Sequence, residues 1–417
     1  MSSRLTRIDA GLTIRLEILE LLSLNHRVLA IYLITGLSFG AGGARNLAIP
    51  LYADQLGASR GEIGLLFSTF TITAALLSLP SGLLADRFGR RNMVIFSMVA
   101  LGLSQVLAGV THSVAILFLS QLIGGLGGGA AQTSLMAALA DLVPIERMGR
   151  SMGWLTLAMQ SGFLAGPAVA GILLRWLSLE QDILVTVVPV FVALALSFVV
   201  SGAGAPRGQK LEVVRPVRVL FAQEGFLALV IVLLAATILW GTYNAYVPVF
   251  GKRSLGLTGT EVGYLLAIQA IVNGGTRIPA GRLLDRVKNK APVVSLTVIG
   301  FAIGLAILPH LHGFWLPTLV LLFAVPMIAT AFIAIGLVFI QMASADSRGT
   351  AMGIYSTVLF LGLGTGPAIF APLMNRGYVV GFTACALLGA AMAMLALIVR
   401  TEPIRSRRRA AVIPPSP

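Results

Sequence analysis

The sequence is poor in charge and almost free of cysteine. Aspartate, glutamate, lysine and arginine make up 11% of the 417 residues, whereas about a quarter of an ordinary soluble domain is charged. The single cysteine, Cys385, excludes a disulfide within the chain and does not resemble part of a metal site. The sequence therefore predicts a membrane protein rather than a soluble domain, with no metal and no other cofactor.

Acidic and histidine side chains are also missing from the centres of the apolar stretches. All sixteen Asp and Glu residues, and the four histidines, are expected in loops, tails or the end turns of helices. An enzyme that works inside a membrane needs a nucleophile with a base, or a metal cluster, at that depth. We therefore do not expect enzymatic activity.

Long hydrophobic runs dominate the rest of the chain. Hydrophobic residues account for 57% of it, and a helix needs roughly 20 of them to cross the ~30 Å hydrocarbon core of a bilayer. Each crossing segment must be a helix, because lipid offers exposed backbone groups no hydrogen-bond partner. The sequence predicts twelve transmembrane helices, at about 28–52, 61–85, 92–111, 113–139, 151–173, 183–202, 224–250, 261–284, 292–309, 315–341, 351–374 and 379–399.

Positive charges are distributed unevenly between the predicted loops. The net charge of +14 would suit nucleic acid, but with both termini in the cytoplasm 23 of the 30 Lys and Arg residues fall on cytoplasmic segments. The segments predicted outside carry only Arg60, Arg175, Lys252, Arg253 and Arg376. This asymmetry follows the positive-inside rule. We expect an integral protein of the cell membrane, in contact with lipid rather than nucleic acid, with both termini cytoplasmic.

A repeated polar phrase indicates that the chain is duplicated. The run Gly82–Arg91 (GLLADRFGRR) and the run Gly281–Arg286 (GRLLDR) each lie between apolar stretches, 199 residues apart. Ordered matches of Gly, Pro and Asp continue through both halves. The sequence therefore predicts an all-α fold of two pseudo-symmetric six-helix bundles. Its predicted segments are a cytoplasmic N-terminal segment (1–27), the first bundle (28–202), a cytoplasmic linker (203–223), the second bundle (224–399) and a basic cytoplasmic tail (400–417).

These motifs resemble the major facilitator superfamily over essentially the whole chain. The family's loop motif G-x-x-x-D-R-x-G-R-R is matched at every fixed position of the run Gly82–Arg91. The second copy keeps Gly281, Asp285 and Arg286 but has Asn-Lys where Gly-Arg would follow. The resemblance implies two parallel six-helix halves with a substrate site at their interface.

The resemblance also implies a gating role for the loop motif. Asp86 would face the start of the eleventh span near Gly349 and Thr350, where exposed amides carry about half a positive charge, and Asp285 would face the start of the fifth span. Both contacts would close the cytoplasmic side; in the alternative interpretation these charges only set topology. The predicted gate residues are Gly82, Asp86, Arg87, Gly89, Arg90, Arg91, Gly281, Asp285 and Arg286.

The fifth predicted span carries a second family signature, associated with exporters and chiefly with drug–proton antiporters. Its residues here are Gly153, Gly162, Gly166, Pro167 and Gly171, with alanine in place of one glycine. Bare glycines also let helices pack closely, and a similar pattern recurs in the eleventh span. The signature is therefore compatible with an antiport role and with a plain packing role.

Polar side chains within the spans are the candidates for a substrate cavity, because lipid makes them costly. Arg45 and Arg277 are the two intramembrane cations, and either could instead pair with carbonyls or reach an interface. In proton-coupled exporters of this family an arginine normally lies in the fourth span, where this chain has Gln121. The predicted cavity residues are Arg45, Asn46, Gln121, Gln160, Tyr243, Asn244, Gln269, Asn273 and Arg277.

The predicted function is secondary transport of a small molecule by alternating access. The first choice is efflux of small apolar or cationic compounds, from the fifth-span signature and the apolar spans. The alternative is a carrier of an organic anion that uses Arg45 and Arg277, and a remote alternative is a non-transporting sensor. We expect a monomer, and the sequence leaves open whether a proton or another ion is coupled to transport.

The loop motif generates a direct prediction. Asp86→Asn should lower transport several-fold without lowering membrane insertion, because a carboxylate at a helix N-terminus contributes up to ~2 kcal/mol. Transport is measured in cells that express the two proteins equally. Unchanged transport at equal expression would leave only the topological interpretation.

Overall fold

The structure is a computed structural model that describes residues 26–143, 147–200, 214–343 and 348–398. The described chain is helical and forms the twelve spans of the predicted fold. Its long helices are α2 (His26–Gln55), α3 (Arg60–Phe88), α4 (Arg90–Val110), α5 (Val114–Leu142), α6 (Met148–Leu173), α7 (Leu179–Val185) with α8 (Val187–Ser197), α10 (Phe226–Arg253), α11 (Gly259–Arg286), α12 (Ala291–Ile307), α13 (Trp315–Met342), α14 (Arg348–Arg376) and α15 (Tyr378–Ala393).

Eleven of these spans are long and apolar enough to cross a membrane, counted over the described residues. The twelfth is α11, which has 28 residues and packs between α6 and α13 but carries more polar side chains. Its inward-lying polar residues include the predicted cavity residues Gln269, Asn273 and Arg277. A helix whose polar face meets protein need not be apolar all round.

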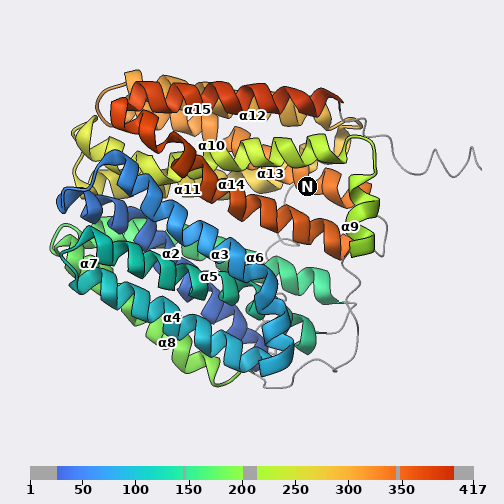
Figure 1. The fold of residues 1–417 in the computed structure, drawn as a ribbon, viewed down its shortest axis with the longest axis horizontal. Helices are drawn as coiled ribbons and strands as arrows, with labels where there is room; N and C mark the ends of the chain where they lie inside the picture. Colours follow the sequence, from blue (N-terminus) through green and yellow to red (C-terminus); the bar gives the residue numbers. More distant parts are fainter. Residues whose placement is uncertain (1–25, 144–146, 201–213, 344–347, 399–417) are drawn as a thin grey trace, which may run out of the picture.

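The helices form two bundles, one from each half of the sequence. Figure 1 shows the first half, from α2 to α8, below the second half, from α10 to α15. Within the first half α2 packs on α6, and in the second half α10 packs on α14, its counterpart. Several pairs join the halves, chiefly α3 with α14 and α6 with α11. The predicted fold class is confirmed.

We name the two ends of the molecule by the helix termini that they hold. The outer end, at the left of Figure 1, holds the last turn of α2, the first turns of α3, α7 and α11, and the last turns of α6, α10 and α14. The inner end, at the right, holds α9 (Val214–Phe221). The names follow the predicted orientation of the chain.

Capping residues set where three helices begin at the outer end. Ser59, Ser178 and Thr258 each accept a hydrogen bond from the amide three residues later, and the Glu or Gln there bonds back to the cap amide. Such capping boxes satisfy two otherwise unpaired amides. At the inner end Gly89, with φ of 91°, alone joins α3 to α4. This left-handed conformation is where the fixed glycine of the loop motif is needed.

The sixth span differs from its prediction. It begins at Leu179 rather than at about residue 183, and it is interrupted at Thr186, between α7 and α8. The capping box of Ser178 starts the helix a turn earlier, so Asp182 lies in the first turn of α7. The linker predicted over 203–223 contains the short helix α9, while residues 201–213 lie outside the described chain.

Glycines let α6 approach α2 at close range. A Cβ added to Gly162 would lie 2.7 Å from the amide nitrogen of Gly40, and one added to Gly166 would lie 2.6 Å from that of Ala44. In the second half Gly366 meets α10 in the same way, with the Cα of Ile238 at 3.0 Å. The packing interpretation therefore accounts for Gly162, Gly166 and Gly366.

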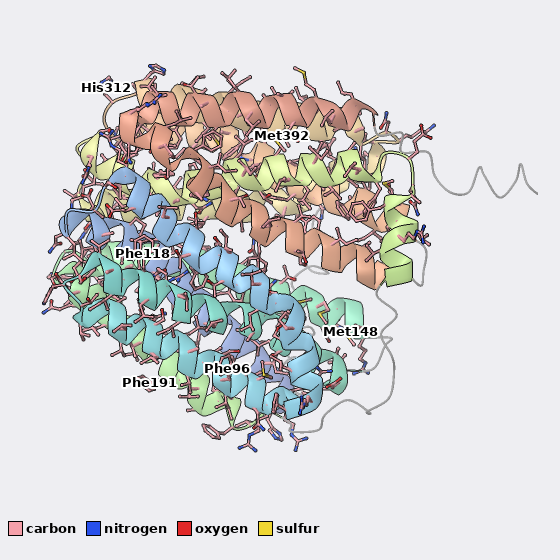
Figure 2. The ribbon with its side chains drawn as sticks, in the orientation of Figure 1. Phe96, Phe118, Met148, Phe191, His312 and Met392 are labelled. Atoms are coloured by element: carbon pink, nitrogen blue, oxygen red, sulfur yellow. The ribbon has the colours of Figure 1, made fainter. Side chains whose placement is uncertain are left out.

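Apolar side chains cover the outside of the bundles, as a membrane requires. Phe96 on α4 and Phe191 on α8 project from the lower margin of the molecule in Figure 2. Their exposed fractions are 44% and 59%, values that would be unfavourable for aromatic side chains in water. The bilayer supplies the apolar surroundings that these side chains need.

The close α2–α6 contact predicts a difference between two glycines of one helix. Gly162→Ala should lower the melting temperature in detergent, because an oversized side chain at a tight contact costs about 1–3 kcal/mol. Gly153→Ala, with no atom within 4 Å of its added Cβ, should leave it unchanged or raise it. Thermal unfolding followed by tryptophan fluorescence measures both, and equal effects would contradict the close-packing account.

Candidate functional site

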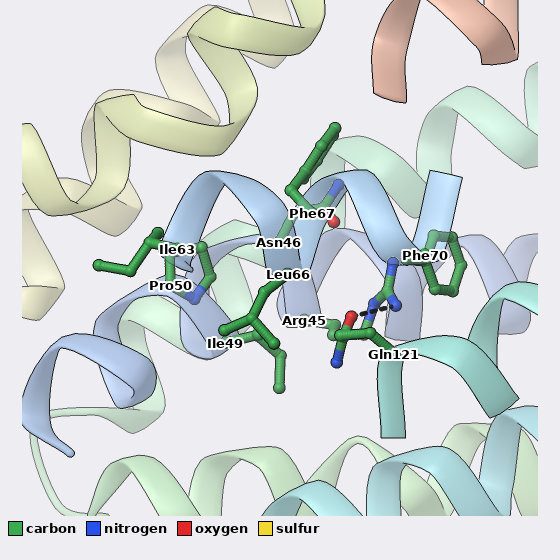
Figure 3. Close-up of a pocket in the computed structure, with 9 residues that line it drawn as sticks. All are labelled: Arg45, Asn46, Ile49, Pro50, Ile63, Leu66, Phe67, Phe70 and Gln121. Atoms are coloured by element: carbon green, nitrogen blue, oxygen red, sulfur yellow. Dashed lines mark hydrogen bonds between the residues drawn. The ribbon is translucent and has the colours of Figure 1, made fainter. Parts of the chain in front are cut away.

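A pocket in the first half gathers three of the predicted cavity residues. It is lined by Arg45, Asn46 and Gln121 together with aliphatic and aromatic side chains, Ile49, Pro50, Ile63, Leu66, Phe67 and Phe70. Figure 3 shows Arg45 between Gln121 and the Phe70 ring. The lining is mostly apolar with a few polar groups, as in small-molecule sites, but in this conformation the pocket holds about 10 Å³ of accessible space, about enough for one water molecule.

Arg45 is held in this pocket by neutral partners. Its Nη1 donates to Gln121 Oε1 at 3.0 Å, and its Cζ lies 3.3 Å from the centroid of the Phe70 ring. Only 7% of Arg45 and 3% of Gln121 are exposed. Gln121 therefore meets an arginine from α2 at the fourth-span position where the family normally has its own arginine. No carboxylate among the described residues pairs with Arg45.

Arg277 forms a second polar centre, and this one bridges the two halves. With the amide oxygen of Gln160 facing the guanidinium, that oxygen accepts from Arg277 Nε at 3.0 Å and from Nη2 at 2.9 Å. Asn273, one turn earlier on α11, lies 3.4 Å from the same two nitrogens. Three of the predicted cavity residues thus meet between α6 and α11.

The remaining cavity candidates have partners within their own half. Tyr243 donates to Gln269 Oε1 at 3.4 Å and stacks on Trp240, 5.2 Å between ring centroids. Asn244 donates to the carbonyl of Trp240 on its own helix at 2.7 Å. These contacts fit a packing role, and the structure brings neither residue to the Arg45 pocket.

The fifth-span signature divides between two neighbours of α6. Gly162, Gly166 and Pro167 face α2 in the same half, whereas Gly171 faces Gly263 of α11 in the other half. A Cβ added to Gly263 would lie 2.5 Å from the Cα of Gly171. Gly153 has no neighbour within 4 Å of an added Cβ.

The loop motif lies at the inner end. The contacts of two of its residues, Gly82 and Asp86, and of the predicted partners Gly149 and Thr350 lie outside the described part of the structure. Arg90 Nε pairs with Asp141 of α5 at 3.1 Å, inside its own half. Arg87 and Arg91 lie over the rings of Phe88 and Phe198, and Gly281, Asp285 and Arg286 lie at the exposed or half-buried end of α11. The gating role of the motif stays a prediction.

The outer end holds an ion pair between the halves that the sequence did not predict. Asp54, at the end of α2, pairs with Arg253 Nε and lies 3.9 Å from Lys252 Nζ, both at the end of α10. The Asp54 side chain is 9% exposed. We call Asp54, Lys252 and Arg253 the outer latch.

Two further cations reach across the outer end. Arg60 of α3 donates to the carbonyl of Met374 at 3.3 Å and lies 4.6 Å above the Tyr378 ring. Arg175, just after α6, donates to the hydroxyl of Tyr264 on α11. Four of the five cations predicted outside therefore join the halves. Their position against the positive-inside asymmetry was the signal that could have identified them.

One carboxylate lies in an end turn, as expected of the acids, but is fully buried there. Asp182 of α7 has no exposed surface, and neither of its oxygens has a hydrogen-bond partner among the described residues. Its burial was missed because the sixth span was predicted to start one residue after it. The capping box Ser178–Gln181 was the readable sign of the earlier start.

Comparison with known proteins decides the family. The sequence profile of the Major Facilitator Superfamily matches residues 31–291 and 251–414. The chain belongs to the major facilitator superfamily. This superfamily consists of transporters rather than enzymes, so the expected absence of enzymatic activity agrees with it.

Among this superfamily the chain is similar in sequence to two resistance proteins. It is 26% identical over 148 residues to the quinolone resistance protein NorA of Staphylococcus aureus, covering 36% of this chain and 38% of that one. It is 24% identical over 238 residues to multidrug resistance protein 1 of Bacillus subtilis strain 168, covering 55% and 59%. The chain spans between two fifths and three fifths of the curated relatives it matches.

Solved structures of the superfamily share the fold. The nucleoside transporter NupG superposes with a TM-score of 0.72 at 13% identity, over 90% of this chain and 98% of that one. A D-xylose–proton symporter gives 0.72 at 17% identity, over 88% and 96%. A bacterial homologue of the lysosomal transporter Spinster, in an inward-facing conformation, gives 0.71 at 17%, over 89% and 96%. At these identities the likeness concerns the fold alone.

The outer latch generates a prediction for this major facilitator transporter. Asp54→Asn should lengthen the distance between spin labels placed at Trp176→Cys and Ser254→Cys, which are exposed on opposite halves of the outer end. Losing this partly exposed ion pair, which contributes ~1 kcal/mol, should lower the ratio of closed to open molecules about fivefold.

The control for this measurement is a cation at the same end. Arg376→Gln, at the exposed end of α14, should leave the distance distribution unchanged. All labelled proteins carry Cys385→Ala to remove the native thiol. An unchanged distribution in Asp54→Asn would show that the latch does not hold the outer end closed.

Proposed function

We propose that the chain is an exporter that moves small, largely apolar compounds across the cell membrane by alternating access. The observation that carries the proposal is the lining around Arg45, which is aliphatic and aromatic apart from three polar residues. In this conformation the lining encloses space for about one water molecule, so in the proposed cycle it becomes part of a substrate cavity when the helices move apart. Sequence similarity to two resistance proteins supports the direction of transport and the chemical class. The sequence has no nucleotide-binding motif, so a gradient of an ion or of the substrate is the energy source.

The contacts between the halves support an alternating cycle. The described contacts run from the outer latch to the level of Gly364 on α14, where an added Cβ would lie 2.7 Å from Thr71 Oγ1 of α3. The structure therefore represents a conformation closed at the outer end. In the proposed cycle the loop motif at the inner end closes when the outer contacts separate, and both chain termini lie on the inner side.

Charge inside the bundle narrows the substrate class. Among the described residues, the partners of Arg45 and Arg277 are neutral groups, the Phe70 ring and the amides of Gln121, Gln160 and Asn273. A cationic substrate would lie near two positive charges that no neighbouring carboxylate offsets among the described residues, which opposes binding. The arrangement supports neutral substrates better than cationic ones.

The same observation favours a second candidate, a carrier of organic anions. A carboxylate is the natural bidentate partner of a guanidinium, and a substrate carboxylate could replace Gln160 beside Arg277. Under this alternative the two arginines recognise the substrate. Under the exporter proposal Arg277 holds α11 to α6 through Gln160.

Substitution of Arg277 separates the two candidates. In proteoliposomes Arg277→Gln should remove uptake of an organic anion by at least tenfold, because a charged hydrogen bond contributes ~1.5–3 kcal/mol, while efflux of neutral drugs should fall by less than threefold. Arg277→Lys, which keeps the charge, should preserve more anion transport than Arg277→Gln. Drug sensitivity of a pump-deficient host that expresses the chain tests the exporter proposal itself. If the host is as sensitive with the chain as without it across a broad panel of drugs, the proposal is refuted.

A further inference from the structure

The buried carboxyl of Asp182 has no counterpart among the other acids of the described chain. Asp54 pairs with Arg253, Asp141 with Arg90, and Glu180 accepts from Gln55 at 3.2 Å. Asp182 is fully buried, and both of its oxygens are without a partner among the described residues. An ionised carboxylate at such a site would lose its hydration with nothing in return, so a buried carboxyl of this kind is held in the neutral, protonated form.

On α4, one of the two helices that pack against α7, the residues near the level of Asp182 are uncharged. One turn later, Thr186 donates to Gln105 of α4 at 2.6 Å, and an added Cβ at Gly102 of α4 would meet Val190 at 3.6 Å. This stripe of the sixth span therefore packs on α4. From Gly102 to Val110 that helix has no ionisable residue, so α4 offers Asp182 no cation.

Other titratable groups lie on the elements beside α7. Near the outer end they are Tyr52 and Asp54 on α2, Glu180 on α7 itself and His112 between α4 and α5; α8 has none. Two turns earlier along α2, Arg45 is held by Gln121 and the Phe70 ring. Asp54 is paired in the outer latch, and Glu180 bonds to Gln55. The Tyr52 hydroxyl donates to the carbonyl of Thr111 and lies 3.3 Å from His112 Nδ1. The negative charges of Asp54 and Glu180 add to the cost of a charge on Asp182.

The last turn of α2 covers this region and also carries the outer latch. Residues 51–55 follow Pro50, which removes a backbone hydrogen bond and permits the helix to bend there. On one side Gln55 bonds to α7 and Tyr52 to the end of α4, the two elements next to Asp182. On the other side Asp54 bonds to Arg253 of α10. A movement that separates the latch therefore acts on the segment that shields Asp182.

From this juxtaposition we propose that Asp182 is a proton-binding site linked to the outer end: its carboxyl holds a proton while the latch is closed and releases it to water when the latch opens. The O–H bond of the carboxyl breaks, the proton passes to water, and a hydrated carboxylate remains. Closing reverses the step by taking a proton from the outer side. The proposal rests on the alternating-access function proposed above, and it concerns the conformation rather than the substrate.

The coupling between proton binding and opening of the outer end fixes the direction and size of the expected pH effect. Because the closed conformation binds one more proton than the open one, a rise in pH favours opening. For a single proton the ratio of closed to open molecules should fall by up to tenfold for each pH unit. The spin-label pair Trp176→Cys and Ser254→Cys, in the Cys385→Ala background and without substrate, reports this ratio.

Four proteins make the test specific. The unsubstituted labelled protein should open as pH rises, whereas Asp182→Asn, a neutral mimic of the protonated acid, should stay closed at every pH. Glu62→Gln, at an exposed acid in the first turn of α3, and His112→Gln, the nearby histidine, should keep the pH dependence. A pH response that persists in Asp182→Asn, or disappears in His112→Gln, overturns the proposal.

Infrared spectroscopy provides an independent readout of the proton. The protein at neutral pH should show the C=O band of a protonated carboxyl in an apolar site, and Asp182→Asn should lack it. If Asp182→Asn does not fold, Asp182→Glu should shift the band, and an unshifted band overturns the proposal. Neither the spin-label nor the infrared measurement needs a substrate. If the drug panel refutes the efflux proposal, these two measurements still test proton binding by Asp182 separately.

Discussion

The absence of hydrogen-bond partners in lipid is the constraint on which this structure depends. Every polar side chain that enters the bundles must find a partner inside the protein. Arg45 finds Gln121 and the Phe70 ring, and Arg277 finds Gln160 across the halves. Hydroxyls on the helices bond back to carbonyls of the preceding turn, as Ser97 does with Met93 at 2.7 Å. A few buried hydroxyls, such as that of Ser134, have no partner among the described residues, and Asp182 stands out because both oxygens of its carboxyl have none.

The same constraint explains how much of the fold could be predicted. Twelve apolar stretches, a repeated loop motif and uneven positive charge were sufficient for two six-helix bundles, since few other structures satisfy a backbone in lipid. The polar centres were predicted as single residues only. Arg45 and Gln121 are 76 positions apart, and Arg277 and Gln160 lie in different halves, so their pairing depends on how helices rotate and pack.

The cations predicted outside the membrane are exceptions to the charge asymmetry, and the structure gives a reason for most of them. Loop cations outside the membrane act against the preferred topology, so each needs another reason to be there. Arg60, Arg175, Lys252 and Arg253 all have partners in the opposite half. Their partners are carbonyls, tyrosines and one carboxylate, which sequence periodicity does not identify. Asp182 was missed for a different reason, because hydropathy locates the centre of a span better than its capped end.

The single residue between α3 and α4 has a consequence for the lipid around the protein. Gly89 alone joins them, and Gly377 alone joins α14 to α15, so neither connection has slack. The helices α3 and α14 contact each other across the halves, while α4 presents Phe96, Val99 and Leu103 to the bilayer. Movement of the inner pair therefore turns the lipid-facing helices with it and reshapes the hydrophobic perimeter. Because mismatch between that perimeter and the hydrocarbon thickness costs energy, the thickness of the host membrane becomes one of the quantities that set the rate of the cycle.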